Sequence, residues 1–291
     1  WHLAFPDVFR LPDDGADPEN EQAGWNGGFD VVLGNPPWER TAFEEVPYFS
    51  SRIPEVAAAA TTATRRRMIR DLETEAPELY REFLEERRKA SVEDSFYGSS
   101  GRYPYSSAGR TNTFALFTDL ARSIVSSPGR VGLVVPTAIA TDKPMQQFWQ
   151  WLVDSHRIVS IFDFENRGIW FRSVHGSYKF CLLVLTGSHG HSRSAEFAFF
   201  VETIQDLRTS KRVFHLTAND LALINPVTRQ PPTCSSTDDM QLLLHICRFG
   251  GSIGDSHPAW VGLTSAGSSE LWLDAFGDEM QFNREYVPCY E

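Results

Sequence analysis

The tetrapeptide Asn35-Pro36-Pro37-Trp38 combines residue types that could perform chemistry together. An asparagine side chain offers a carbonyl acceptor, and two successive prolines present backbone carbonyls at fixed φ angles without N–H donors of their own. A tryptophan beside them offers a flat face on which a planar ring could stack. The alternative is a turn that ends a strand and a tryptophan that fills the core, since Asn-Pro is a common way to begin a turn.

The residues before the tetrapeptide must place it. Residues 29–33 form an apolar run that ends at Gly34, and this pattern predicts a short buried strand with a turn at its carboxyl end. Ligands of open α/β sheets bind beyond the carboxyl ends of the strands. The tetrapeptide therefore lies where a binding site is expected.

The rest of the chain supplies the expected sheet. Four further apolar runs predict strands, and two amphipathic stretches predict helices between them. The strands are expected at residues 131–135, 158–164, 179–185 and 196–201, and the helices at 113–125 and 143–153. This alternation predicts an α/β fold with an open, mostly parallel sheet and helices on its faces.

Residues 39–110 differ in composition and predict a helical insert, in which Pro77 begins a helix. The densest basic cluster of the chain lies there and consists of Arg65, Arg66, Arg67 and Arg70. These arginines could contact phosphates, but carboxylates follow them at once in the sequence. We therefore expect solvated helix faces held by salt bridges.

Residues 29–38, which include the tetrapeptide, resemble the catalytic motif of amino-methylating DNA methyltransferases of the N6-adenine class. The pattern of that motif is Asn, Asp or Ser, then Pro-Pro, then an aromatic residue. Four later stretches look like the later motifs of the Eco57I-like restriction–modification methylases. They lie at residues 111–117, 129–136, 176–185 and 223–228.

The resemblance implies the later half of a class I, Rossmann-like methyltransferase sheet that uses S-adenosylmethionine, with a helical insert. In these terms, residues 1–38 hold a strand and the catalytic turn, and residues 39–110 form the insert and a loop. Residues 111–216 continue the methyltransferase core. Residues 217–291 begin a target-recognition or linker region.

The implied reaction is methyl transfer from S-adenosylmethionine to adenine N6 in DNA, within a restriction–modification or phage-defence system. The exocyclic nitrogen is a poor nucleophile because its lone pair is delocalised into the ring. We expect the Asn35 side-chain oxygen and the Pro36 carbonyl each to accept one N6 hydrogen, which turns the lone pair towards the methyl donor. Pro37 would keep the turn rigid, and Trp38 would stack on a flipped-out adenine.

Two further residues take roles from the resemblance alone. Phe171 precedes the strand at 179–185 and is implied to be a second aromatic wall for the base; a core aromatic is the alternative. Asp7 is implied to contact the adenine of the cofactor; an exposed loop acid is the alternative.

Composition limits the partners. The chain has 27 basic and 38 acidic residues and a net charge of −11, so double-stranded DNA must meet a local basic patch or sequence beyond these residues. The four cysteines form no Cys-x-x-Cys pair, so we expect no metal site and no disulfide framework. No apolar run approaches the length of a membrane span, and we expect a cytoplasmic protein with a fused or separate restriction nuclease as a partner.

The chain departs from the family pattern in one respect. The glycine-rich cofactor loop, Phe-x-Gly-x-Gly, would precede Trp1, and no Gly-x-Gly occurs before the tetrapeptide. We therefore expect a fragment of a longer protein that is inactive by itself. Two alternatives stay open: a methyltransferase acting on glutamine N5 of a protein, and a non-catalytic module for DNA binding or assembly.

Overall fold

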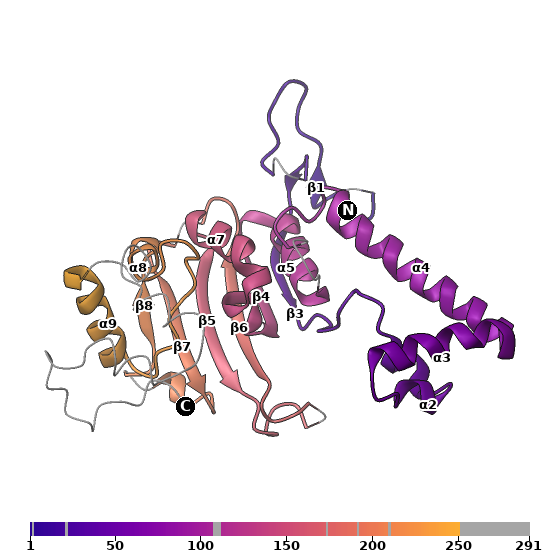
Figure 1. The fold of residues 1–291 in the computed structure, drawn as a ribbon. Helices are drawn as coiled ribbons and strands as arrows, with labels where there is room; N and C mark the ends of the chain where they lie inside the picture. The colour runs from indigo at the N-terminus through magenta and orange to yellow at the C-terminus, as the bar shows by residue number, and fades with distance from the viewer. Residues whose placement is uncertain are drawn as a thin grey trace, which may run out of the picture. The chain divides into compact units, whose positions relative to one another are not determined.

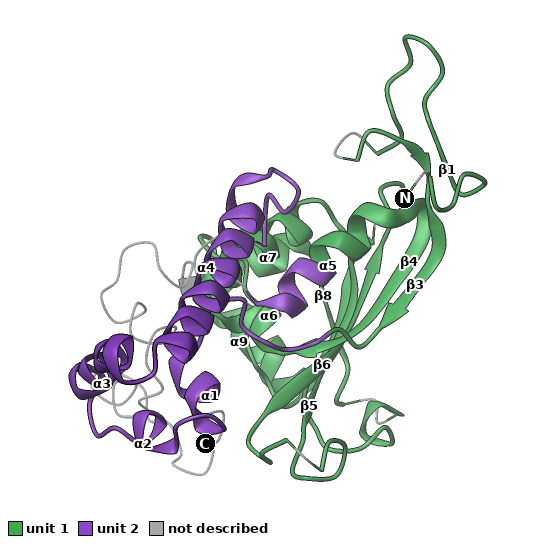
Figure 2. Cartoon of the chain, turned by 90° about the vertical axis from the view of Figure 1, so that its right-hand side faces the viewer, with its two compact units in different colours: residues 1–36, 118–291 green, residues 37–117 purple. Residues whose placement is uncertain are grey.

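The computed structural model describes residues 1, 3–20, 23–106, 112–172, 174–190, 192–208 and 211–250. The chain divides into two compact units, residues 1–36 with 118–291 and residues 37–117, which Figure 2 shows in green and purple. The chain passes from the first unit to the second between Pro36 and Pro37. It returns within helix α5 (Thr113–Ile124), between Phe117 and Thr118. The unit boundary thus falls inside the tetrapeptide.

A six-stranded sheet forms the framework of the first unit, and its order among the described residues is β3-β4-β6-β5-β7-β8. The strands are β3 (Phe29–Gly34), β4 (Val125–Pro136), β5 (Ile158–Glu165), β6 (Lys179–Thr186), β7 (Ala195–Val201) and β8 (Phe214–Leu216). This sheet with its helices confirms the predicted α/β class (Figure 1).

The sheet is mixed, so the prediction of a mostly parallel sheet was wrong. Only β3 with β4 and β5 with β7 pair in parallel; β4 with β6, β5 with β6, and β7 with β8 pair antiparallel. The cause lies in the connection from β5 to β6, which contains no helix. A parallel neighbour needs a long crossover, whereas a chain that turns back directly pairs antiparallel.

The two faces of the sheet differ in burial. Val131, Leu133 and Val135 of β4 and their partners on β6 are buried, whereas the alternating residues Val134 and Leu182 are only half-buried. Helices α6 (Ala138–Thr141) and α7 (Gln146–Asp154) lie on one side of the sheet in Figure 2. The buried Phe148, Trp149 and Leu152 anchor α7, so apolar packing fixes these helices.

Strand β3 is the edge of the sheet, which corrects the prediction that it is buried. Val31 is 58% exposed and Leu33 is 77% exposed, and among the described residues β3 pairs only with β4. The start of the strand is fixed by a close approach at Gly28. This residue has φ +137°, and an added Cβ would lie 2.6 Å from the Ser126 nitrogen. Only glycine fits such a position without strain.

The remaining elements of the first unit are short. They are β1 (Phe9–Arg10) and β2 (Asn26–Gly27), which pair antiparallel, the 3-10 turns Lys143–Met145 and Asp206–Arg208, and the helices α8 (Ala218–Ile224) and α9 (Thr237–Gly250). Thr217 and Asp220 form a capping box at the start of α8. In the part of the chain that the structure describes, no helix has the length and apolar character needed to cross a membrane.

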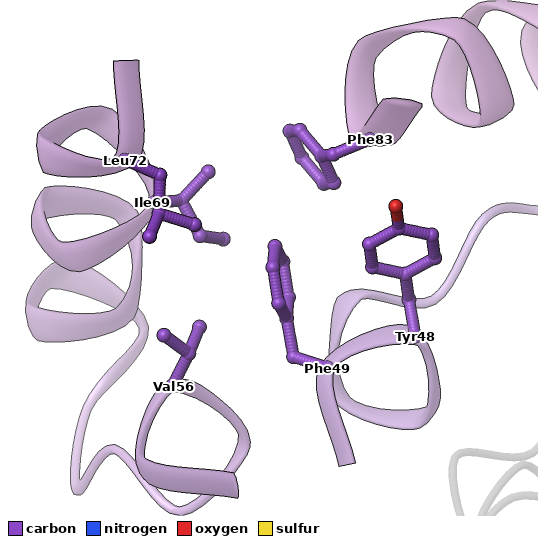
Figure 3. Close-up of a cluster of buried hydrophobic side chains, with 6 residues drawn as sticks. All are labelled: Tyr48, Phe49, Val56, Ile69, Leu72 and Phe83. Atoms are coloured by element: carbon purple, nitrogen blue, oxygen red, sulfur yellow. The ribbon is translucent and has the colours of Figure 1, made fainter. Parts of the chain in front are cut away.

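The second unit is helical and has its own core. Its helices are α1 (Glu45–Ser50), α2 (Pro54–Ala57), α3 (Thr62–Glu75) and α4 (Pro77–Ser99), and Pro77 stands at the start of α4 as predicted. Figure 3 shows the buried side chains that hold these helices together. They are Tyr48, Phe49, Val56, Ile69, Leu72 and Phe83. The unit therefore has a hydrophobic core from which its outer faces can project polar groups.

Candidate active site

The tetrapeptide begins at the carboxyl end of β3. Gly34 is the last residue of the strand and pairs with Leu133 of β4, and residues 35–39 continue without regular secondary structure. Strands β3, β4, β5 and β7 all run in the same direction, so their carboxyl ends share one edge of the sheet. This edge is where ligands of open α/β sheets bind.

The four motif residues differ in exposure. Asn35 and Pro37 are exposed, Pro36 is buried and Trp38 is half-buried. The Asn35 carboxamide can therefore be reached by a ligand from solvent. An amide oxygen beside rigid proline carbonyls is a set of acceptors without competing backbone donors.

Thr113 anchors the backbone that follows Pro36. Its hydroxyl oxygen lies 2.6 Å from the Pro37 carbonyl oxygen, to which it donates, and it accepts a hydrogen bond from the Glu39 nitrogen at 3.0 Å. The Thr113 nitrogen also donates to the Glu39 carbonyl at 2.9 Å. These bonds fix both sides of Trp38. Sequence reasoning placed Thr113 in a family-like stretch but gave it no role, because its partners are 74 and 76 residues away.

Phe171 lies in the loop between β5 and β6 and is held by Asn166. The fully buried Asn166 accepts a hydrogen bond from the Phe171 nitrogen at 2.8 Å and donates to the Phe171 carbonyl at 3.0 Å. The Phe171 ring packs edge-on against the Phe180 ring, with 5.0 Å between the ring centroids. Phe180 in turn stacks on Phe164, with 5.4 Å between the centroids. The half-buried Phe171 is therefore part of an ordered aromatic cluster. Asn166 was not predicted; an asparagine directly after an apolar strand was its only signal.

The structure brings Phe171 to the edge that carries the motif but not next to it. Strand β5 lies three strand spacings from β3, which is about 14 Å. Asp7 lies in an exposed turn at the other end of β3, since the Gly28 nitrogen bonds to the Val8 carbonyl at 3.1 Å. The six residues of β3 span about 17 Å, so Asp7 and Asn35 are separated by the length of the strand.

A cavity of about 670 Å³ lies at the same edge of the first unit, between the end of β4 and the start of β6. Its polar lining includes Thr137, Asp163, Tyr178 and Lys179. Sequence reasoning missed this group. The signal was the one acidic residue inside the apolar run at 158–164.

Asp163 is the most buried carboxylate of this cavity, with 1% of its surface exposed. The Thr137 hydroxyl donates to one carboxylate oxygen, and the Phe200 nitrogen donates to the other at 3.2 Å. Burial raises the pKa of Asp163, and the bond from Thr137 and the charge of Lys179 oppose that rise. Lys179 itself pairs with Glu165 at 3.6 Å.

Cys181 stands opposite Asp163 in the register of β5 and β6. Its thiol is fully buried, and burial together with the Asp163 charge raises its pKa well above the usual value. The thiolate is the nucleophilic form of cysteine. Burial thus disfavours the thiolate form of this cysteine.

The sequence matches no family model and no curated protein. Several solved structures are similar to the chain. One is the methyltransferase subunit of a type I restriction-modification system from Streptococcus thermophilus, with 12% identity, a TM-score of 0.37, and coverage of 48% of this chain and 34% of that chain. Another is the type IIG restriction endonuclease BpuSI, with 13% identity, a TM-score of 0.40, and coverage of 69% and 20%.

A third is a nuclease-deletion mutant of the Type ISP restriction-modification enzyme LlaGI in complex with a DNA substrate mimic. It has 12% identity, a TM-score of 0.32, and coverage of 81% of this chain and 17% of that chain. The chain thus spans about a third or less of the length of these three solved chains. These likenesses carry no argument about function. The evidence for function is the motif of this chain and its position in the sheet.

Proposed function

We propose that the protein containing this chain transfers a methyl group from S-adenosylmethionine to the exocyclic N6 of adenine in double-stranded DNA, in a restriction–modification or phage-defence system. The observation that carries the proposal is the position of Asn35-Pro36-Pro37-Trp38 at the carboxyl end of β3. Residue types that suit an amine acceptor site stand at the ligand-binding edge of an α/β sheet.

Asn35 and Pro36 perform the acceptor-side chemistry. The Asn35 oxygen and the Pro36 carbonyl each accept one N6 hydrogen and so hold the amine in a fixed orientation. With both hydrogens bound, the nitrogen lone pair points out of the plane of the ring. Orientation of this kind removes much of the entropic barrier of a two-reactant step. As the new N6–C bond forms, the bond between the methyl group and the sulfonium sulfur would break. The nitrogen, then cationic, would release one proton to solvent, because the Asn35 amide oxygen and the Pro36 carbonyl are acceptors and not bases.

Trp38 and Phe171 act on the ring of the base. A base inside a duplex cannot reach the motif, so the adenine must leave the stack. Stacking on an aromatic side chain is worth about 1 to 3 kcal/mol per base and offsets part of that loss. Trp38 provides the stacking face next to the acceptors. Phe171, in the loop after β5, is proposed as a second aromatic wall for the base.

The cofactor supplies an electrophilic methyl group on a sulfonium when it is bound. Asp7 is the one proposed contact to it in this chain, and the structure places Asp7 at the far end of β3 from Asn35. The described residues therefore do not form a complete cofactor site around the motif.

The decisive experiment uses the full-length gene product with labelled S-adenosylmethionine and unmethylated duplex DNA, followed by digestion to nucleosides. We expect label in N6-methyladenine, abolished in Asn35→Ala with unchanged folding. Asn35→Asp keeps an acceptor and should retain part of the activity. Asn219→Ala, at an exposed position of α8, is the matched control and should behave as wild type.

Each other outcome selects a different function. Label in protein but not in DNA would assign the motif to a glutamine N5 methyltransferase, because the same turn can hold a carboxamide nitrogen. No label in either, from a folded protein offered varied DNA, would favour a non-catalytic DNA-binding or assembly module. Full activity in Asn35→Ala would overturn the proposed role of the motif.

A further inference from the structure

We infer that Arg66, Arg67 and Arg70 of α3 form a phosphate-binding face that docks the helical unit on the backbone of duplex DNA. The identity of the polyanion rests on the proposed function; the anion-binding character of the face rests on the geometry of α3. Asn35 and Trp38 have no part in it.

The core of the helical unit decides which way α3 faces. Ile69 and Leu72 point into the hydrophobic core (Figure 3), and the Arg65 guanidinium donates to the Val56 carbonyl at 3.3 Å. Successive helix residues turn by about 100°. Arg66, Arg70 and Arg67 therefore fall within a sector about 100° wide on the side away from Ile69 and Leu72. All three are exposed.

The three arginines have no carboxylate partner in the described part of the chain. Asp71 follows Arg67 by four residues and Glu73 follows Arg70 by three, yet no ion pair forms between them. The expectation of salt-bridged faces was therefore wrong for α3. Asp71 and Glu73 lie on the two flanks of the helix, one to each side of the arginine sector.

Other arginines of the same unit behave differently. Arg40 pairs with Glu44 at 3.3 Å, Arg52 with Glu82 at 3.0 Å, and Arg81 with Glu78 at 3.8 Å. The three α3 arginines are thus not neutralised by ion pairs of this kind, a feature that they share with Arg88 and Lys89 of α4. The net charge of the chain is −11, so the chain as a whole does not attract a polyanion. The three arginines provide a local basic face that can.

The chemistry of the face favours nucleic acid backbone over other polyanionic surfaces. Arginine guanidinium groups match phosphate oxygens with paired N–H donors. The exposed large hydrophobic side chains of the described residues lie outside α3. An interfacial membrane helix would bury such side chains beside its cations. Three arginines without neighbouring exposed large hydrophobic side chains suit the phosphates of a nucleic acid backbone, which remain partly hydrated.

The test compares the triple variant R66Q/R67Q/R70Q with wild type in the full-length protein. Its matched control is R81Q/R88Q/K89Q, which removes the same charge from exposed positions of α4 beside Glu78 and Glu85. Duplex affinity is measured against salt concentration. Each lost phosphate contact lowers the slope of log K against log salt by about 0.9, so we expect the α3 variant to lose about 2.7 units on every duplex sequence. The control should keep most of the slope.

The outcomes separate this inference from the proposed function. Methyl transfer at saturating DNA should keep its wild-type kcat in the α3 variant, because the motif is intact, while KM for DNA rises. If no methyl transfer is found at all, the salt slopes still test the arginines. An unchanged slope, an equal loss in the control, no duplex binding by wild type, or a loss seen only with anionic vesicles would each overturn the inference. Because all three side chains are at the surface, we expect the α3 variant to have the thermal unfolding temperature of wild type. An unchanged temperature excludes misfolding as the cause of weaker binding.

Discussion

Thr113→Val tests whether the anchor beside Pro37 positions the motif. The substitution keeps the shape of the side chain and removes the hydroxyl that bonds to the Pro37 carbonyl at 2.6 Å and to the Glu39 nitrogen at 3.0 Å. A net hydrogen bond is worth about 0.5 to 1.5 kcal/mol, so two are worth about 1 to 3 kcal/mol. Both bonds lie near the surface, where water replaces part of them, and this favours the lower end.

If about 1 kcal/mol of positioning energy is lost in the transition state, kcat for methyl transfer falls about fivefold, and a full 3 kcal/mol gives about 150-fold. The assay is single-turnover transfer to N6 of adenine, with duplex affinity measured in parallel. We expect kcat to fall while affinity holds, because Thr113 is a positioning residue. Thr113→Ser restores the hydroxyl and should restore the rate.

Thr74 offers a matched control within the same unit. The Thr74 hydroxyl donates to the Asp71 carbonyl at 3.0 Å on α3, so Thr74→Val removes an equivalent bond far from the motif in sequence. It should leave kcat unchanged. Wild-type kcat in Thr113→Val, or an equal fall in the serine or Thr74 variants, would refute the positioning role.

Two further predictions concern the cores. Because burial raises the pKa of Asp163, the folded state binds the carboxyl proton more tightly than the unfolded state does. The free energy of unfolding therefore falls as pH rises from about 4 through the raised pKa. The fall is at most about 1.4 kcal/mol per pH unit. Asp163→Asn lacks this dependence. Urea unfolding should therefore show the free energy of unfolding of wild type decreasing relative to that of the variant across this pH range. Parallel plots of unfolding free energy against pH would contradict the prediction. Phe83 is 1% exposed, and its ring centroid lies 5.3 Å from that of Phe49 and 5.7 Å from that of Tyr48. Phe83→Ala should therefore destabilise the helical unit by about 3 to 5 kcal/mol. Limited proteolysis should then cut within residues 37–117 first, and resistance equal to wild type would count against an independent core.

The strand positions could be predicted because apolar runs report burial directly, and β5, β6 and β7 lie where the pattern put them. The order of the strands could not. Nothing in residues 179–186 states that this strand enters between β4 and β5; that choice depends on pairing partners distant in sequence. The pattern of β3 was misleading for a related reason. Apolar side chains on both faces show what a strand is suited to contact, not which contacts the chain supplies.

The candidate site was predictable only where its residues are contiguous. Asn35 and its neighbours form a recognisable string, whereas Thr113 and Asn166 act through hydrogen bonds that the sequence does not display. Asp163 was visible as a charge inside an apolar run, but the cavity around it depends on the fold. The arginines of α3 were visible as a cluster. Their lack of carboxylate partners could not be predicted, because the spacing of Arg67 and Asp71 favours an ion pair that the structure does not form.

The unit boundary within the tetrapeptide divides the proposed chemistry in two. Asn35 and Pro36 belong to the unit that contains the sheet and directly follow Gly34, the last residue of β3 that pairs with β4. Pro37 and Trp38 belong to the helical unit, where Thr113 fixes them. Loss of the core around Phe83 should therefore weaken base stacking by Trp38, a term of about 1 to 3 kcal/mol, while the acceptor pair keeps its framework. Phe83→Ala should then raise KM for DNA and lower kcat without abolishing transfer, in contrast to Asn35→Ala.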